Sequence, residues 1–327
     1  MRLLFILDPL PELKAWKDSS VAMMRAARDR GHEVWAATAE ALSWIGGSGV
    51  CAVAVRLEVS DDNAAWYGEA AHESLRLADC AAVIMRKDPP FDIEYVTTTW
   101  MLERAEAEGA RVFNRPRALR DHSEKFALTE FPQFAPKTLI TRDPAQLSAF
   151  IDAEGDTVLK PLDGMGGSRI FRVRRDDPNR NVIIETLAEY GARTVMAQVY
   201  LPAISEGDKR ILVIGGEVVP FCLARIPKAG ESRGNLAAGG TGIARPLSAR
   251  DREIAEALAP VLAARGLLLV GLDVIGEQLT EINVTSPTCM VEIREQTGFD
   301  AATMFVSALE RECKTFHHRD TETQRKS

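Results

Sequence analysis

Asp273, Glu281 and Asn283 have the side chains and the spacing of a divalent-metal site. Two carboxylates that face each other with no lysine or arginine between them repel by about 4 kcal/mol at a separation of ~4 Å and an effective dielectric constant near 20. A cation is therefore expected between them. Two carboxylates and one amide suit Mg²⁺, which completes its octahedron with water and substrate phosphates. The pattern D-x7-E-x-N fits a solvated polar strand face equally well, so other stretches must decide.

The stretch GLDVIGEQLTEINVTSPT, which begins at Gly271, must position these side chains. It reads as strand, tight turn and strand, because residues 267–275 are apolar and β-rich and residues 279–284 alternate. An odd-length loop, Gly276-Glu277-Gln278, would place the two carboxylates directly opposite each other. The amide of Asn283 would then fall on the same face of the hairpin.

A glycine-rich loop lies between two strand-like segments in the middle of the chain. It runs from Asp163 to Ser168 as DGMGGS, with Lys160 on the preceding segment and Lys125 further upstream. Backbone N–H groups of such a loop can wrap phosphate oxygens while lysines add positive charge. A GMGG hairpin alone is more often an ordinary turn. Two lysines and an acidic metal site together favour a triphosphate, because Mg²⁺ and lysine both neutralise it, so ATP is the expected ligand.

Composition excludes several classes of protein. The chain has 327 residues, 46% of them apolar, so it can build a large core and is long enough for two or three domains. A net charge of −7 gives no electrostatic footprint for nucleic acid or an anionic membrane. The N-terminal apolar run, residues 3–7, is stopped by Asp8-Pro9 and is too short for a signal peptide or a membrane span. These features predict a cytoplasmic protein.

Cysteine and histidine give little support to other site chemistries. The five cysteines are scattered and show no C-x-x-C, so a disulfide framework or a zinc site is not expected. The five histidines do not pair at ligand spacing, which disfavours a histidine-based metal site or triad.

Strand and helix patterns alternate in the first third of the chain. Residues 2–7 read as a buried strand, and residues 18–30 begin with cap residues, continue with helical spacing and end at Gly31. No G-x-G-x-x-G follows the first strand, which disfavours a dinucleotide site, and no G-x-x-x-x-G-K-[ST] is present. The alternation predicts a parallel sheet with helices on its faces, continued by strands at 32–37, 81–85 and 111–113 and a helix at 95–108.

Two further units are expected from His122 onward. A small α+β unit should surround the glycine loop, with strands at 137–140, 157–160, 169–173 and 194–200, a helix that starts at Asp143-Pro144, and another at 181–190. The last unit should hold strands at 210–214 and 217–225, a helix at 248–265, the hairpin, a closing helix at 299–314 and a frayed polar tail at 315–327.

A long loop is expected at residues 227–242. It has sixteen residues with five glycines, which is too long for an idle connector and fits a lid, although plain disorder would also account for it.

Several strings closely resemble bacterial glutathione synthetase, an ATP-grasp ligase family. The likeness runs in order from residue 1 to about residue 290, and only the last ~35 residues look unlike the family. Thr241-Gly242 stands where a more basic sequence would be expected, which leaves the details of loop closure open. The strings are MRKDPPFD from Met85, LKPLDGMGG from Leu159, YLPAI from Tyr200, CLARIP from Cys222, RGNLAAGG from Arg233 and TEINVTSPT from Thr280.

This resemblance implies a fold and a reaction. The fold would be α/β, with α+β character in the nucleotide-binding part: an N-terminal parallel-sheet substrate domain (1–121), a small central lid domain (122–202), a C-terminal mixed-sheet domain (203–314) and the polar tail. The reaction would join γ-glutamylcysteine to glycine while ATP becomes ADP and phosphate, through an acyl phosphate. The family also implies Mg²⁺ or Mn²⁺ and a homotetramer.

Site residues follow by resemblance, position by position. Asp18 could instead serve only as a helix cap, and the arginines could instead be surface residues of a basic strand face. Triphosphate contacts would be Lys125, Lys160, Gly164, Met165, Gly166 and Gly167; adenine contacts Gln198, Val199, Tyr200 and Leu201; the ribose contact Asp208; metal ligands Asp273, Glu281 and Asn283. Candidate catalytic residues are Arg210, Arg225 and, in the loop, Arg233; peptide contacts would be Asp18, Ser20, Arg86, Asn235, Asn283, Ser286 and Thr288.

Two other functions stay open from the sequence alone. One is that of an ATP-grasp ligase that joins a different carboxylate and amine, and the other is that of a nucleotide-binding regulatory protein with inactive chemistry. The candidate positions are all occupied by competent residues, which argues against an inactive site. If Glu281 is a metal ligand, Glu281→Gln is predicted to lower turnover severely with little loss of fold.

Overall fold

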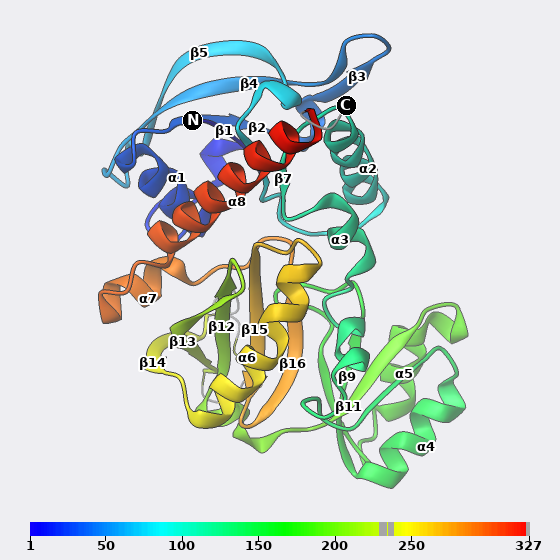
Figure 1. Ribbon diagram of the computed structural model, residues 1–327. Coiled ribbons are helices and arrows are strands. Elements are labelled where there is room, and N and C mark those ends of the chain that lie inside the picture. Colours follow the sequence, from blue (N-terminus) through cyan, green and yellow to red (C-terminus); the bar gives the residue numbers. More distant parts are fainter. Residues whose placement is uncertain (229–233, 235–238, 325–327) are drawn as a thin grey trace.

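Three β-sheets follow one another along the chain (Figure 1). The structure, a computed structural model, describes residues 1–228, 234 and 239–324. Residues 2–113 build a seven-stranded sheet, residues 138–199 a four-stranded sheet and residues 208–283 a five-stranded sheet. Helices and strands thus combine as the α/β prediction requires. Each sheet lies inside one of the three predicted domains, whose boundaries stay a prediction.

The first sheet combines a parallel centre with an antiparallel extension. β2, β1, β6 and β7 are parallel neighbours, whereas β4 pairs antiparallel with β2, β3 and β5. The prediction of a parallel sheet is therefore wrong for the extension, which sequence patterning does not reveal because β5 is polar or exposed along most of its length. The strands are β1 (Arg2–Ile6), β2 (Glu33–Ala37), β3 (Leu42–Ile45), β4 (Gly49–Val59), β5 (Tyr67–Arg76), β6 (Ala82–Met85) and β7 (Val112–Phe113).

Alternate residues of β1 pack under helices on opposite faces of this sheet. Leu3 and Phe5 pack with α1 (Ser19–Asp29), and Leu4 and Ile6 with α2 (Ile93–Ala107). α1 begins where the Asp18 carboxylate accepts bonds from two backbone N–H groups of the first turn. The short helix α3 (Pro116–Asp121) leads out of this part of the chain.

The central sheet is small and has its own core. Its strands run β10-β9-β11-β8, all in antiparallel pairs. Leu147 and Ile151 of α4 and Ile184 of α5 pack with Leu159 and Val173 of the sheet. As predicted, α4 begins after Asp143, which caps it. The elements are β8 (Thr138–Thr141), α4 (Pro144–Glu154), β9 (Asp156–Pro161), β10 (Phe171–Arg174), α5 (Arg180–Ala188) and β11 (Val195–Val199).

The third sheet runs β14-β13-β12-β15-β16 and is antiparallel throughout. β14 (Thr241–Pro246) was not predicted; it takes Thr241 and Gly242 out of the expected loop, because they pair with Ile226 and Arg225. Most of the loop lies outside the described residues. One sheet face packs on α6 (Ala249–Ala264). The other strands are β12 (Asp208–Ile214), β13 (Glu217–Ile226), β15 (Leu269–Ile275) and β16 (Gln278–Asn283).

Two helices close the chain and tie its ends together. α7 (Met290–Thr297) is followed by α8 (Ala301–Gln324), which packs along α1 of the N-terminal part (Figure 1). α8 continues past Lys314, so the prediction of a frayed tail is wrong for residues 315–324, a stretch that has neither glycine nor proline to end a helix. None of the described helices is long and apolar enough to cross a membrane.

His122 lies buried where the second predicted unit begins. Its Nδ1 lies 3.4 Å from Arg265 Nη1, and among the described residues its buried Nε2 has no hydrogen-bond partner. Burial, assisted by the charge of Arg265, lowers the pKa of His122 from 6.5 to about 4. Between these two pKa values the unfolded chain binds more protons than the folded chain, so the free energy of unfolding falls as the pH drops. The loss is complete below the folded pKa and amounts to about 3 kcal/mol.

We therefore expect the free energy of unfolding, measured with urea, to show a contribution that falls by about 2 kcal/mol between pH 7 and pH 5. The variant His122→Gln should lack this contribution. His72, whose side chain is 64% exposed, provides the control variant His72→Gln, which should keep the wild-type pH dependence. Equal pH dependence in wild type and His122→Gln would contradict a neutral buried histidine.

Candidate functional site

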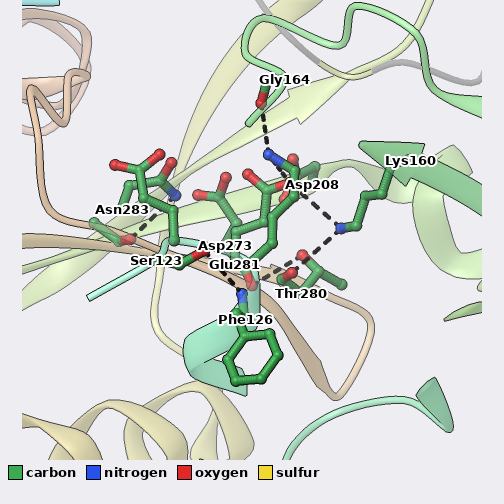
Figure 2. A network of polar contacts seen from close by, with 12 residues as sticks. Ser123, Phe126, Lys160, Gly164, Asp208, Asp273, Thr280, Glu281 and Asn283 are labelled. Atoms are coloured by element: carbon green, nitrogen blue, oxygen red, sulfur yellow. Dashed lines mark hydrogen bonds and ion pairs between the residues drawn. The ribbon is translucent and has the colours of Figure 1, made fainter. Parts of the chain in front are cut away.

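One face of the C-terminal sheet gathers the charged residues that the sequence singles out (Figure 2). Asp208 and Arg210 share this face because they are alternate residues of β12. Arg225 of β13 pairs with Asp208, and Asp273 of β15 pairs with Arg210. The face is completed by β16, which adds Glu281 and Asn283.

Asp273 pairs with Glu281 as predicted, but through different geometry. The strands close over the two-residue turn Gly276-Glu277, so the expected three-residue loop is wrong. The register shifts by one between Asp273 and Val274, which makes Thr280 the extra residue of a β-bulge. The Thr280 hydroxyl donates to the Asp273 carbonyl oxygen at 3.1 Å. The bulge supplies the residue that the shorter turn lacks and restores the facing carboxylates.

Two arginines neutralise Asp273. Its carboxylate accepts two bonds from Arg210, the Nη2 bond at 2.9 Å, and Arg225 Nη2 lies 2.8 Å from its Oδ2. Burial raises the pKa of Asp273, but Arg210 and Arg225 outweigh it and hold the pKa well below its usual range. The expectation of carboxylates with no arginine or lysine between them is therefore wrong, because arginines from neighbouring strands reach Asp273.

Two buried lysines surround Glu281. Its Oε1 lies 3.5 Å from Lys125 Nζ and 3.4 Å from Lys160 Nζ. Burial would raise the pKa of Glu281, but the two lysines outweigh it and lower that pKa. Burial also lowers the pKa of Lys160, which Glu281 partly restores. Glu281 thus holds two cations close together at the predicted phosphate position.

Asp208 is the least satisfied carboxylate of this face. Its Oδ2 accepts a 2.5 Å bond from Arg225 Nη2, while its Oδ1 is buried with no partner in the described part of the chain. Burial raises the pKa of Asp208 to about 6, and the charges of Asp273 and Glu281 add to the shift against the opposing charge of Arg225. An additional cation here would stabilise the ionised form.

The donor set of this face fits a hard divalent cation. Carboxylate and amide oxygens are the ligands that Mg²⁺ takes in proteins, and the unpartnered Asp208 oxygen lies beside them. No group of three or more His, Cys, Asp or Glu side chains within residues 1–228, 234 and 239–324 is arranged to hold a metal ion. The predicted set of Asp273, Glu281 and Asn283 has only two such side chains, so it stays a prediction.

Lys125 connects the glycine loop to the acidic face. Its Nζ donates to the Gly164 carbonyl oxygen at 2.6 Å and lies 3.5 Å from Glu281 Oε1. Gly166 and Gly167 have φ of 61° and 79°, a backbone conformation that side chains other than glycine rarely adopt. The loop, which follows β9, thus lies against Lys125, as a loop that covers bound phosphates would.

A cavity of about 290 Å³ joins the glycine loop to the charged face. Its lining takes residues from the central and C-terminal sheets and from the segment after β16. It brings together these predicted residues: Lys125, Lys160, Gly164, Met165, Gly166, Gly167, Gln198, Val199, Tyr200, Leu201, Asp208, Arg210, Arg225, Asp273, Glu281, Asn283, Ser286 and Thr288.

The predicted adenine segment, residues 198–201, consists of the end of β11 and the two residues that follow it, and it lines this cavity. Gln198 is buried and its Nε2 donates to Thr138 Oγ1 at 3.0 Å, so its side chain is held by β8. The Arg172 guanidinium lies 3.6 Å from the centre of the Tyr200 ring. Sequence reasoning missed Arg172, because this stacking joins β10 to the residue that directly follows β11.

The N-terminal candidates lie beside the cavity. Within the described residues, Asp18, Ser20 and Arg86 are not part of its lining. Asp18 acts as the α1 cap, which is the alternative role that its sequence position allows. Arg86 is buried, and its Nε and Nη2 donate at 3.0 Å to Ser20 Oγ and the Pro287 carbonyl oxygen. Its buried Nη1 has no partner in the described chain, so Arg86 can still bind an acceptor beside Ser286 and Thr288.

Arg233 and Asn235 lie outside the described residues. Sequence reasoning also missed Asp88 and Glu124. Asp88 accepts a short bond from Ser286, and Glu124 binds the backbone after β16. Glu124 stands directly before Lys125, and that adjacency is the only sequence signal that could have singled it out.

Family models match almost the whole chain. The N-terminal domain of prokaryotic glutathione synthetase matches residues 1–120, and the ATP-grasp domain of prokaryotic glutathione synthetase matches residues 124–298. The chain belongs to the prokaryotic glutathione synthetase family. The resemblance stated from the sequence is thereby confirmed.

Curated relatives support the same family over almost the whole chain. The glutathione synthetase of Ralstonia nicotianae is 58% identical over 95% of this chain and 96% of its own length. Those of Nitrosomonas europaea and Shewanella oneidensis are 56% and 50% identical, each over 95% of this chain and 98% of their own lengths.

Solved structures share the ATP-grasp fold at low identity. The ligase PsnB, complexed with a minimal precursor, Mg and ADP, superposes with a TM-score of 0.61 at 18% identity, covering 96% of this chain and 98% of its own. The D-cycloserine synthetase DcsG gives 0.65 at 16% identity, covering 96% of this chain and 100% of its own. These neighbours confirm the ATP-grasp architecture of this glutathione synthetase family member.

Proposed function

We propose that this chain joins γ-glutamylcysteine to glycine with cleavage of ATP, the second step of glutathione biosynthesis. Family membership over nearly the whole chain carries the proposal. The cysteinyl carboxylate attacks the γ-phosphorus and ADP leaves, which gives an acyl phosphate. The glycine amine then adds to the acyl carbon, and the tetrahedral intermediate expels phosphate to form the amide.

Positioning and charge neutralisation are the main requirements of phosphoryl transfer, and the sheet face supplies both. Lys125, Lys160 and backbone N–H groups of residues 164–167 would hold the triphosphate, with adenine along residues 198–201 and Asp208 toward the ribose. Arg210 and Arg225 would face the transferring phosphoryl group and the developing oxyanion. Arg233 and Asn235 belong to the lid in this proposal, which would protect the acyl phosphate from water.

Asp273, Glu281 and Asn283 would hold Mg²⁺ or Mn²⁺, whose chemistry when bound is to neutralise and orient the phosphate oxygens.

Asn283 would also face the peptide. On the peptide side, Arg86 would bind a carboxylate through its unpartnered Nη1, with Asp18, Ser20, Ser286 and Thr288 around the dipeptide.

We further propose a cytoplasmic homotetramer, the assembly that the family resemblance implies, which light scattering of the purified protein can test.

Mass analysis of the products tests the reaction. Purified protein incubated with ATP, Mg²⁺, γ-glutamylcysteine and glycine should give glutathione, ADP and phosphate in equal amounts. Omission of either γ-glutamylcysteine or glycine should abolish phosphate release. Release with other acid and amine pairs, but not with this pair, would favour a ligase of different specificity, and no release with any pair would favour a nucleotide-binding protein without ligase activity.

A further inference from the structure

The backbone between β16 and α7 is held by side chains instead of by regular secondary structure. Residues 284–289 belong to neither a strand nor a helix, yet this segment carries Ser286 and Thr288 and follows directly on Asn283. The backbone N–H and the backbone carbonyl group of Val284 each bond to a side chain. Both side chains belong to residues that precede the central sheet in the chain. The N–H of Val284 donates to Glu124 at 3.0 Å, and its carbonyl oxygen accepts from Asn114 at 2.9 Å.

Glu124 gathers three donors on one carboxylate oxygen. Its Oε1 accepts from Val284 N at 3.0 Å, from Thr285 N at 3.2 Å and from Thr285 Oγ1 at 2.9 Å. Its own carbonyl oxygen accepts from Ile282 N of β16 at 2.9 Å. Burial raises the pKa of Glu124, while the bonds from Thr285 and Val284 oppose that shift. Glu124 thus binds the end of β16 and the segment after it as one unit.

Asn114 holds the same segment from the other side. It is 6% exposed, and its Nδ2 donates to the carbonyl oxygens of Leu269 at 2.8 Å and Val284 at 2.9 Å. Its Oδ1 accepts from Leu269 N at 3.0 Å. Leu269 is the first residue of β15, which carries Asp273, and Val284 directly follows β16, which carries Asn283. Asn114 therefore joins the start of one strand to the end of the other.

We propose that Glu124 and Asn114 are positioning residues that fix Asn283 and Ser286 relative to each other. This inference rests on the proposed function, because it assigns Ser286 to the peptide substrate. Among the described residues Asn114 is not part of the cavity lining, and Glu124, which does line the cavity, uses its Oε1 to hold the segment. Backbone N–H and carbonyl groups that lose buried partners carry a large free-energy cost, so the segment would move to find new ones when either side chain is replaced.

Two variants of Glu124 separate positioning from charge. Glu124→Gln keeps a carbonyl oxygen that can accept the backbone bonds, whereas Glu124→Met keeps the size and removes the acceptor. We expect Glu124→Met to weaken γ-glutamylcysteine binding, measured by calorimetry, at least about tenfold, and Glu124→Gln to stay within about threefold of wild type. ADP binding without metal should be unchanged in both, because Lys160 of β9 and Gln198 of β11 lie on strands of the central sheet, to which neither Glu124 nor the segment after β16 belongs.

Asn114→Leu provides an independent arm and should reproduce the selective loss of γ-glutamylcysteine affinity. If Glu124→Met or Asn114→Leu does not fold, Thr285→Val, which removes one of the three donors, should show a smaller loss in the same direction. Thr98→Val is the matched control, since it removes a buried hydroxyl bond, to the Glu94 carbonyl oxygen at 2.9 Å, within α2. It should lower stability without changing either affinity.

The outcomes distinguish this inference from the proposed function. A wild-type protein that does not bind γ-glutamylcysteine would refute the function itself. Wild-type binding with equal affinity in folded Glu124→Met and Asn114→Leu would overturn the positioning role. Equal losses in Glu124→Gln and Glu124→Met would also overturn it, because the charge of Glu124 and not its hydrogen-bonding geometry would then matter.

Discussion

Substitution of Arg225 by methionine is expected to destabilise the fold by about 3–5 kcal/mol and to lower turnover by at least about 100-fold. Arg225 is 4% exposed and lies between the largely buried Asp208 and the buried Asp273, at 2.5 Å from Asp208 Oδ2 and 2.8 Å from Asp273 Oδ2. Methionine preserves much of the volume but removes the one cation among the described residues that forms an ion pair with Asp208. A broken buried ion pair costs this much because the remaining charge is neither solvated nor neutralised.

The pH dependence of the loss identifies its cause. Burial already raises the pKa of Asp208 to about 6 with Arg225 present, and removal of Arg225 takes away the main opposing charge. A carboxyl group whose folded pKa is raised favours the folded state at low pH and loses that advantage as the pH rises through the folded pKa. The stability deficit of Arg225→Met should therefore be larger at pH 8 than at pH 5 in urea unfolding.

Arg117→Met is the matched control. Arg117 forms a surface pair with Asp121, and both side chains are more than half exposed, so we expect a change below about 0.5 kcal/mol and unchanged turnover. A fully stable Arg225→Met protein with no pH-dependent deficit would mean that the two carboxylates have other means of neutralisation.

The fold could be predicted from the sequence where local patterns decide it. Asp18 and Asp143 cap helices where expected, because a cap depends on its own first turn. The β3–β5 extension could not be predicted, since β5 is held by pairing with β4 and not by an apolar face of its own. The turn of the β15–β16 hairpin is one residue shorter than expected, and the bulge at Thr280 restores the pairing of Asp273 with Glu281.

At the site, the sequence identified residue types better than their partners. Arg210, Arg225 and Asp273 were all candidates, yet their mutual ion pairs could not be foreseen, because strands that are far apart in the chain bring them together. Glu124 and Asn114 escaped notice for the same reason. Apart from the Thr285 hydroxyl, the partners of the two side chains are backbone groups at residues 269 and 284–285, and nothing in a residue's type reveals such long-range bonds.

The lysine cluster changes the expected consequence of Glu281→Gln. We expect turnover to fall by at least about 100-fold, since a charged ligand of the proposed metal site is lost. In place of little loss of fold, we also expect a loss of stability, because Glu281 is the acidic neighbour of Lys125 and Lys160, which are 4% and 5% exposed. Glutamine keeps the size of the side chain but not the charge, so the two lysines would lose the carboxylate that contacts both of them and would repel each other more strongly.

Two stability measurements separate this effect from general damage. Burial lowers the pKa of Lys160 and Glu281 opposes the shift, so the variant should lower that pKa further. A lysine with a depressed folded pKa binds its proton more weakly in the folded state, so the deficit should shrink as the pH rises, opposite to Arg225→Met. ATP without metal brings negative phosphates to the same lysines and should stabilise Glu281→Gln more than wild type in thermal unfolding.

Glu253→Gln is the control for the loss of a surface carboxylate, since Glu253 pairs with Arg250 at 2.9 Å and is 60% exposed; its stability and its response to ATP should match wild type. If Glu281→Gln is as stable as wild type at every pH, the lysines do not depend on Glu281. If it is less stable but gains nothing extra from ATP, the phosphates do not bind at these lysines. The same substitution thus tests both roles of Glu281, as counter-charge of the two lysines and as ligand of the metal that would accompany the triphosphate.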